Sequence, residues 1–352
     1  MPSYFPSLPV ALLALAPLTA HAQDDNALAR CLEIAGTPNA GVPITPEVQA
    51  EEVAAIREAA PFCAEAVEAG ATDAAALFHH GTALQLVGDH RAAIAQFEAA
   101  SEAGLGAADT KLGDYSLFGI GPARTDLDRA AEHYRRGVER GDLAAMATLG
   151  LLYRIGRGVP RDAGRMVELM TQAADGGYHF AQLRLGQTYL TGDGIPGGAD
   201  ETLNIPDRDR AARYFSMAAE QGSLEAALEL AKIYSEADGP GTGDPDLQLR
   251  WTQTAADAGL AEAVGALGFL YERGRGVEAD PERAAELYVA ALETGDVDLD
   301  GLRGEVGGRV PPWDDATARA FQVILQERGL YRGAIDGIIG PGSRAGAAAL
   351  DD

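Results

Sequence analysis

A two-residue element, usually leucine followed by glycine, recurs along this chain at a nearly constant interval. Its second residues are Gly113, Gly150, Gly186, Ala231 and Gly268, so successive copies lie 37, 36, 45 and 37 residues apart. A fixed interval of roughly 20–50 residues is typical of an array of stacked structural repeats. The chain is therefore expected to fold as a row of similar units, each in contact with its neighbours along the row.

The first half of each unit has the spacing of an α-helix. In "LGLLYRIGRGV", Leu149, Leu152, Tyr153 and Gly156 occupy the i, i+3, i+4 and i+7 positions of one helix face. The glycine next to the leucine has no side chain, so a partner helix can approach closely there. Gly156 and Gly158 are expected to end the helix, because glycine takes the left-handed cap conformation without steric cost. The tyrosine and the glycines are thus interpreted as core and cap residues.

The second half of each unit predicts another helix. An acidic residue follows the turn in a position to cap it: Asp162 in one copy, Asp207 or Asp209 in the next, and Asp280 in the last. The helix carries alanine and aromatic residues on one face, as in "RAARYFSMAAEQG". Each unit is then a helix–turn–helix hairpin whose apolar face needs a neighbour to cover it. The predicted fold class is all-α, a right-handed α-solenoid of such repeats with a small helical C-terminal domain.

These motifs resemble the Sel-one-like repeats, relatives of the tetratricopeptide repeats, over residues 107–296. Residues 74–106 instead resemble a true tetratricopeptide repeat, with matches at Gly81, Leu84, Gly88, Ala93, Phe97 and Ala100. Two copies depart from the pattern, because Ser116 replaces the tyrosine of the first and Ala231 replaces the glycine of the fourth, whose turn reads "SEADGPGTGDPD". The insertion "GIPGGADETLNIPDRD" accounts for the one longer interval. The resemblance implies a surface that binds protein partners and carries out no chemistry.

The C-terminal region has a different composition. Residues 297–312 are rich in glycine, aspartate and proline and are interpreted as a linker. Residues 313–352 then resemble the small peptidoglycan-binding-like domain of many bacterial cell-wall hydrolases. The matches are Phe321-Gln322, Gly329, Tyr331, Gly333, Asp336-Gly337, Gly340-Pro341, Ser343 and Ala345. The resemblance is truncated, because the family's final aromatic-glutamine turn has no counterpart before Asp352.

Three residues of this segment are candidates for binding the cell wall. Tyr331 and Arg344 are expected to be exposed, as a stacking ring and as a donor to a carboxylate. Asp336 is expected to pin the turn between two helices. The second of these helices is expected from Ala345 to Leu350, after the "GPGS" turn.

The N-terminus has the features of a secretory leader. Residues 8–18 are apolar, and Ala20-His21-Ala22 forms a site that a signal peptidase would cut before Gln23. The apolar run is shorter than the roughly 20 residues that a membrane-spanning helix needs. We therefore expect residues 1–22 to be a signal peptide, with no membrane span and a periplasmic or otherwise exported location. The alternative is an apolar cytosolic N-terminus, because no lysine or arginine precedes Arg30.

The two cysteines, Cys31 and Cys63, both lie in an N-terminal helical segment, residues 23–73. In an oxidising compartment, two cysteines and no third favour one disulfide. The alternative is a pair of buried free thiols, which a non-exported chain would favour.

No motif in the sequence points to catalysis, to a metal or to a cofactor. The histidines after the leader are His79, His80, His90, His133 and His179, and no two have the spacing of a metal site. The glycine-rich turns lack the Lys-Ser/Thr of a phosphate-binding loop. The acidic loop at residues 238–246 does not fit the spacing of a calcium-binding EF-hand.

The balance of charge restricts the partners. Fifty-three acidic residues against 28 basic ones give a formal net charge of −25, which would repel the phosphates of nucleic acid. The sequence favours an exported, non-enzymatic scaffold that binds an envelope protein through its repeats and associates with the cell wall. The main alternative is a peptidoglycan-binding module with the repeats as a spacer, and an unrecognised hydrolase is a third hypothesis.

Overall fold

The computed structural model describes residues 18–192, 206–235, 243–303 and 310–351, with side chains from residue 26 onward. These residues form sixteen α-helices and one 3-10 helix and contain no β-strand. The all-α class and the array of helical repeats are therefore confirmed for this part of the chain. Residues 1–17 of the expected leader, 194–205 of the insertion and 236–242 of the fourth-copy turn lie outside the described residues.

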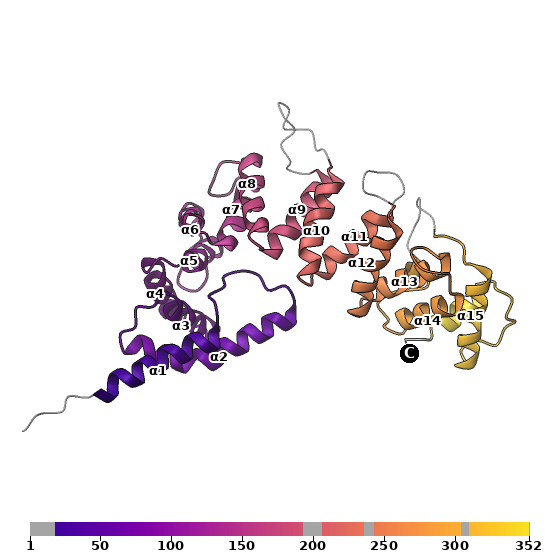
Figure 1. Cartoon of the computed structure of the whole chain (residues 1–352), viewed down its shortest axis with the longest axis horizontal. Coiled ribbons are helices and arrows are strands. Elements are labelled where there is room, and N and C mark those ends of the chain that lie inside the picture. The colour runs from indigo at the N-terminus through magenta and orange to yellow at the C-terminus, as the bar shows by residue number, and fades with distance from the viewer. Residues whose placement is uncertain (1–17, 193–205, 236–242, 304–309, 352) are drawn as a thin grey trace, which may run out of the picture. The chain divides into compact units, whose positions relative to one another are not determined.

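The first of two compact units comprises residues 1–152 and 157–160. From α1 to α6, each helix contacts the next one along the chain. The helices pair as antiparallel hairpins, α1 with α2, α3 with α4 and α5 with α6 (Figure 1). The helices are α1 (Leu18–Ala35), α2 (Pro46–Glu68), α3 (Ala74–Leu86), α4 (His90–Glu102), α5 (Gly106–Phe118), α6 (Leu127–Glu139) and, except for its last turn, α7 (Leu143–Ile155).

The second unit comprises residues 153–156 and 161–352, and each of its α-helices from α8 onward contacts the next α-helix. The hairpin pattern continues as far as α14, after which a short 3-10 helix and two further helices follow. The helices are α8 (Ala163–Asp175), α9 (His179–Thr191), α10 (Arg208–Glu220), α11 (Leu224–Ser235), α12 (Pro245–Asp257), α13 (Ala261–Arg273), α14 (Pro281–Leu292), η1 (Gly301–Arg303), α15 (Asp315–Glu327) and α16 (Pro341–Ala347).

The expected cleavage point before Gln23 lies within α1, which begins at Leu18. Among the helices that the structure describes, none is both long and apolar enough to cross a membrane. Leader removal would therefore shorten α1 and leave the part that carries Cys31.

A glycine of the first helix lies against an aromatic ring of the second helix in several hairpins. In three Sel-one-like hairpins this is the glycine beside the leucine, in the pairs Gly113–Tyr134, Gly186–Phe215 and Gly268–Tyr288. In the tetratricopeptide-like hairpin, Gly81 lies against the ring of Phe97. A Cβ atom at Gly268 would lie 2.9 Å from the Tyr288 ring. The four aromatic side chains are completely buried. The predicted close approach of the two helices is confirmed, and its physical reason is the space that the ring occupies.

The tyrosines of the repeated motif have a different position from the one expected. Leu149 and Leu152 are buried, whereas Tyr153 and Tyr271 are partly exposed. The backbone oxygens of these tyrosines accept hydrogen bonds from the amides of Asp162 and Asp280, both at 3.0 Å. The tyrosine position therefore closes the turn through its backbone more than it fills the core.

The two glycines of the turn have separate functions. Gly274 and Gly276 have φ angles of 62° and 69°, in the left-handed region that glycine favours. Gly274 caps α13, and a Cβ atom at Gly276 would overlap the carbonyl oxygen of Pro245, the first residue of α12. Gly158 has the same relation to Leu127, the first residue of α6. The turn of one repeat therefore rests on the backbone at the start of the preceding repeat's second helix.

The predicted aspartate caps are confirmed. The side chains of Asp162, Asp207 and Asp280 accept hydrogen bonds from the backbone amide three residues later, at 2.8, 3.0 and 2.9 Å. Of the two candidates in the third copy, Asp207 is the cap, because α10 already contains Asp209. Each cap satisfies an amide that the first helical turn leaves without a partner.

Two features of the C-terminal region differ from the sequence-based expectation. The second helix of the segment begins at Pro341, four residues before the predicted start at Ala345, and ends at Ala347. Proline is favoured at the first helical position, because its missing amide is not needed there. The segment expected as a linker is also packed where it is described, since Leu299, Leu302 and Arg303 are buried.

The turn contact predicts that the two glycines differ in their tolerance of alanine. At both positions alanine must adopt a positive φ angle, which costs about 1 kcal/mol. Gly276→Ala also forces its Cβ atom onto the Pro245 oxygen, whereas at Gly274 the nearest atom lies 3.3 Å away. We expect Gly276→Ala to lower the free energy of unfolding by about 1–3 kcal/mol more than Gly274→Ala does. Urea unfolding followed by circular dichroism measures both, and equal losses would contradict this contact.

Candidate functional site

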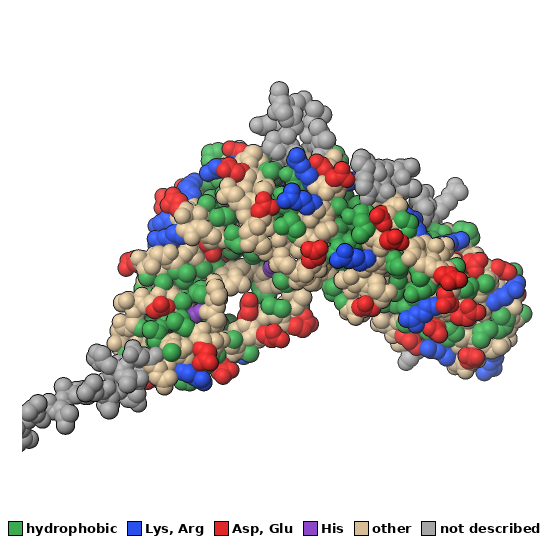
Figure 2. All heavy atoms as spheres, in the orientation of Figure 1, with side chains coloured by type: hydrophobic (Ala, Val, Ile, Leu, Met, Phe, Trp, Pro, Cys, Tyr) green, Lys and Arg blue, Asp and Glu red, His purple; other side chains and the backbone are tan. Residues whose placement is uncertain are grey.

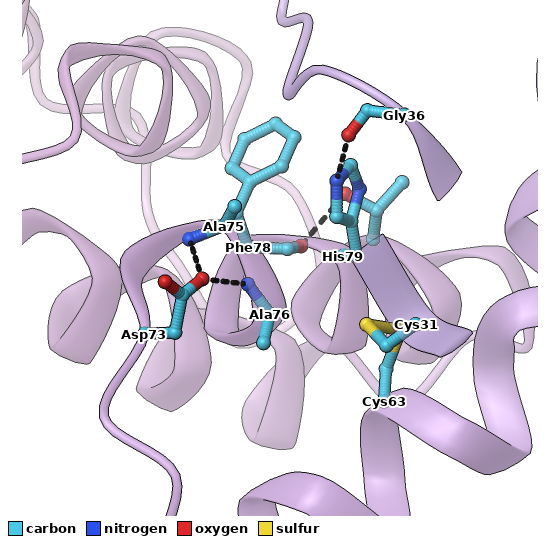
Figure 3. Close-up of a disulfide and its surroundings, with 9 residues drawn as sticks. Cys31, Gly36, Cys63, Asp73, Ala75, Ala76, Phe78 and His79 are labelled. Carbon is cyan, nitrogen blue, oxygen red and sulfur yellow. Dashed lines mark hydrogen bonds between the residues drawn. A yellow bond between two sulfur atoms is a disulfide. The ribbon is translucent and has the colours of Figure 1, made fainter. Parts of the chain in front are cut away.

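A disulfide joins the first two helices of the chain. Cys31 on α1 and Cys63 on α2 are bonded, with Cα atoms 4.8 Å apart, as the sequence favoured (Figure 3). Both cysteines are buried beside Ala59 and Ala76. The two cysteines are 32 residues apart in the sequence. In the chain-entropy model their bond stabilises the folded protein by about 3–4 kcal/mol, because it restricts the unfolded state. It fixes α1 to α2, and Ala76 of α3 packs in the same buried cluster.

His79 is a structural residue of the same region. Its Nε2 atom donates a hydrogen bond to the Gly36 carbonyl at 3.0 Å, which ties α3 to the end of α1 (Figure 3). Burial lowers the pKa of His79, because the charged imidazolium loses its hydration. Burial therefore favours the neutral ring, and the hydrogen bond to Gly36 gives it a structural role.

A buried carboxylate organises the first Sel-one-like hairpin. The Asp109 side chain on α5 is fully buried and accepts hydrogen bonds from Ser101 at 2.8 Å and from Arg136 at 3.1 Å, and also pairs with Arg140. These partners come from α4 and α6. Arg136 also contacts His133, where burial and then the neighbouring arginines lower the pKa of the ring to about 4. The charged groups here bind one another and hold three helices together.

The C-terminal segment is built around a buried amide. Gln322 on α15 is fully buried, and its Nε2 atom donates at 3.0 Å to Asp336 and at 3.0 Å to the carbonyl of Ile338. Its Oε1 atom accepts from the Gly337 amide at 3.0 Å. The hydrogen bonds from Gln322 and from the Ile338 amide lower the pKa of Asp336. Asp336 therefore pins the turn between α15 and α16, the role that its position in the motif suggested.

The other two candidate wall-binding side chains, Tyr331 and Arg344, are also engaged within the protein. Tyr331 is partly buried rather than fully exposed, and its hydroxyl donates to the Ala334 carbonyl at 2.8 Å. Its ring occupies the space beside Gly333 and Gly342. Arg344 is exposed and pairs with Asp300 at 2.9 Å. Tyr331 and Asp336 lie near each other, because the Gln322 Nε2 atom is 3.5 Å from the Tyr331 hydroxyl and 3.0 Å from Asp336 Oδ1.

A buried ion pair joins this segment to the last repeat. Arg303 on η1 and Glu272 on α13 have fully buried side chains, with Arg303 Nε 3.1 Å from Glu272 Oε2. Glu272 also accepts from the Tyr288 hydroxyl at 2.6 Å and from the Asp314 amide at 2.8 Å. The guanidinium lies over the ring of Trp313, 5.0 Å from its centroid. Burial and the nearby Glu272 carboxylate raise the pKa of Tyr288, so its hydroxyl remains a donor.

The last repeat and the C-terminal segment also share one hydrophobic core. Tyr288 and Leu292 of α14 belong to the same buried cluster as Phe321, Leu325 and Ala347. On the face shown in Figure 2, acidic and basic side chains are interspersed around this end of the unit. The segment is therefore an integral cap of the array. Sequence reasoning missed Glu272 and Arg303, because neither belongs to a repeated pattern.

Comparison with protein families identifies the array. Five consecutive matches to the Sel1 repeat cover residues 106–142, 143–178, 179–223, 224–260 and 261–296. Together they span 191 of the 352 residues. The chain belongs to the Sel1 repeat family, which is the Sel-one-like family that its motifs resemble. Each match corresponds to one helical hairpin, from α5–α6 to α13–α14.

Individual relatives support the same assignment. Chitin synthase regulatory factor 3 of Schizosaccharomyces pombe is 38% identical over 141 residues, which are 39% of this chain and 14% of the relative. An uncharacterized protein of Neisseria meningitidis serogroup B is 29% identical over 184 residues, 52% of this chain and 36% of the relative. The chain thus spans little more than a third of these relatives at most. A solved Sel1 repeat protein from Oxalobacter formigenes is 26% identical, with a TM-score of 0.50 over 68% of this chain and 88% of its own.

The buried ion pair predicts how the cap is held in place. Glu272→Gln leaves the Arg303 guanidinium buried without its counter-charge, so we expect the free energy of unfolding to fall by about 3–5 kcal/mol. Limited proteolysis should also release the C-terminal segment faster than in the unaltered chain. The control is Glu278→Gln, which removes an exposed carboxylate from the same repeat. Indistinguishable melting temperatures for the two variants would show that the pair does not hold the cap.

Proposed function

We propose that the chain is a non-enzymatic adaptor that binds another protein through the surface of its repeats. The observation that carries this proposal is the array of five consecutive Sel1 hairpins over residues 106–296. Arrays of this kind present an extended surface for recognition. The buried carboxylates Asp109 and Glu272 have structural partners, which supports a scaffold role. The name of the Schizosaccharomyces pombe relative, a regulatory factor for chitin synthase, fits an adaptor that acts on another protein.

The adaptor is assigned to the cell envelope. The leader-like residues 1–22 support export, and the disulfide between Cys31 and Cys63 supports an oxidising compartment, because disulfides are rare in the cytosol. The partner is accordingly another envelope protein. Association with peptidoglycan through residues 313–352 is a secondary property, supported by the resemblance of this segment and by the exposure of Arg344.

Export predicts both the first residue and the thiol state of the native protein. Protein purified from the organism should begin at Gln23 by mass spectrometry, and Cys31 and Cys63 should resist alkylation until a reductant is added. The control is the same chain without residues 2–22, produced in a reducing cytosol, where both thiols should react after denaturation. A native protein that retains Met1, or that is alkylated at both cysteines without reduction, contradicts export.

The adaptor function predicts protein capture that does not depend on the cell wall. The tagged full chain, incubated with envelope extract, should retain a specific protein at moderate salt, where long-range attraction to its acidic surface is screened. Digestion of peptidoglycan in the extract should leave this capture unchanged. Loss of every captured protein at moderate salt would contradict the proposal.

The alternative function has its own test on purified wall sacculi. Deletion of residues 313–352 is unsuitable, because it would expose the core that α14 shares with α15 and α16. Arg344→Gln removes one exposed ion pair of the segment, and Arg319→Gln removes another of similar length as the control. The alternative predicts that the unaltered chain sediments with sacculi, that Arg344→Gln weakens this sedimentation and that Arg319→Gln does not. This result, together with no captured protein, would favour the peptidoglycan-binding module with the repeats as a spacer.

A further inference from the structure

A groove lies at the C-terminal end of the second unit. It has a volume of about 1550 Å³ and is lined by α11, α12, α13, the segment from Gly295 to Arg303, and α16. Sites for small molecules usually enclose roughly 300–1,000 Å³. The groove is therefore better suited to an extended stretch of polypeptide than to a metabolite.

One wall of the groove is fixed by the buried contacts of the array. A Cβ atom at Gly265 of α13 would lie 2.8 Å from the Leu302 carbonyl oxygen, so the 3-10 helix lies directly on that helix. Leu302 and Arg303 are buried, and Arg303 pairs with Glu272. The wall is therefore preformed, and a bound segment would not have to order it.

The floor of the groove provides apolar contact surface. Leu228 and Ala231 of α11, Ala266 and Phe269 of α13, and Val297 line it and are partly exposed. Together they cover two neighbouring repeats and the wall opposite them. Alternate side chains of an extended segment can pack on such a surface while the others point outward.

Carboxylates outnumber basic side chains along the groove by five to four. Its exposed basic residues are already engaged, because Lys232 pairs with Glu229 at 2.8 Å and Arg344 pairs with Asp300 at 2.9 Å. Arg275 donates to the carbonyl of Ser235 at 2.8 Å.

Three further carboxylates line the rim. Glu262, Asp296 and Asp351 are exposed and form no ion pair with any residue that the structure describes. These carboxylates are available to a cationic ligand.

We propose that this groove binds an extended segment of the partner protein in which lysine or arginine alternates with apolar residues. The apolar side chains pack on the floor formed around Ala266 and Phe269, and the basic side chains pair with Glu262, Asp296 and Asp351. The inference rests on the proposed adaptor function and adds the surface and the chemical character of the partner. An acidic segment does not fit, because it would place carboxylates beside the unpaired ones of the rim.

The probe is a fluorescein-labelled peptide of about ten residues, which extends over about 33 Å, with lysine and leucine alternating. Fluorescence polarisation with the full chain at moderate salt should show binding, and the same peptide with glutamate in place of lysine should not bind. The triple variant Glu262→Gln, Asp296→Asn, Asp351→Asn should weaken binding about tenfold, since each exposed charge pair contributes little by itself.

A second triple variant has the same net charge and serves as the control. It combines Glu220→Gln, Glu278→Gln and Glu282→Gln, three exposed acids of the same unit outside the groove, and should bind the lysine peptide as the unaltered chain does. Ala266→Phe, which fills the floor, should also weaken binding while the circular dichroism spectrum stays unchanged.

Several outcomes would overturn the proposal. Equal weakening in the two triple variants would show general attraction to an acidic protein, and binding of the glutamate peptide would remove the argument from charge. If the chain associates with itself and the groove triple variant abolishes this association, the groove is an interface between two copies of the chain. If the groove variants still capture the same envelope protein as the unaltered chain, the groove is not the binding site. The adaptor function would then remain supported.

Discussion

The contact between a glycine and an aromatic ring sets the spacing of the two helices in the hairpins that contain it. Where Gly186 or Gly268 meets the ring of Phe215 or Tyr288, the two helices of a hairpin come close enough to bury the ring completely. A larger residue on the first helix would separate the pair and tilt the surface offered to the next hairpin. In arrays of this kind a repeat is built on its neighbours, so an error in one hairpin passes directly to the following one.

The parts of this structure that repeat could be predicted from the sequence, and the parts that occur once could not. The interval between Leu-Gly pairs located the hairpins, and the position of Asp162 and Asp280 located the helix starts. No sequence pattern indicated that Arg303 would be buried, because it lies in a stretch whose glycine and aspartate content suggested an exposed linker. Its burial depends on Glu272, which is distant in sequence, and on Trp313.

In the C-terminal segment the expected turn is present, whereas one side chain has surroundings that the sequence did not indicate. Gln322 and Asp336 form the turn that the motif requires. Tyr331 was expected to offer a free ring, yet small residues at Gly333 and Gly342 give that ring a place against the backbone. The glycines of such a motif specify where another group can approach the backbone closely. Tertiary packing then determines which side chain fills that space.

The two ends of the array differ from its interior in a way that constrains how the chain can grow. An interior hairpin has a neighbour on each side, so a duplicated copy would find the same contacts that its parent has. The last hairpin carries Glu272, whose counter-charge lies beyond the repeat at Arg303, and the first helices carry a cysteine pair. A copy of the last hairpin would bring a second buried carboxylate without its partner. Lengthening of the array by duplication of its last hairpin is therefore disfavoured.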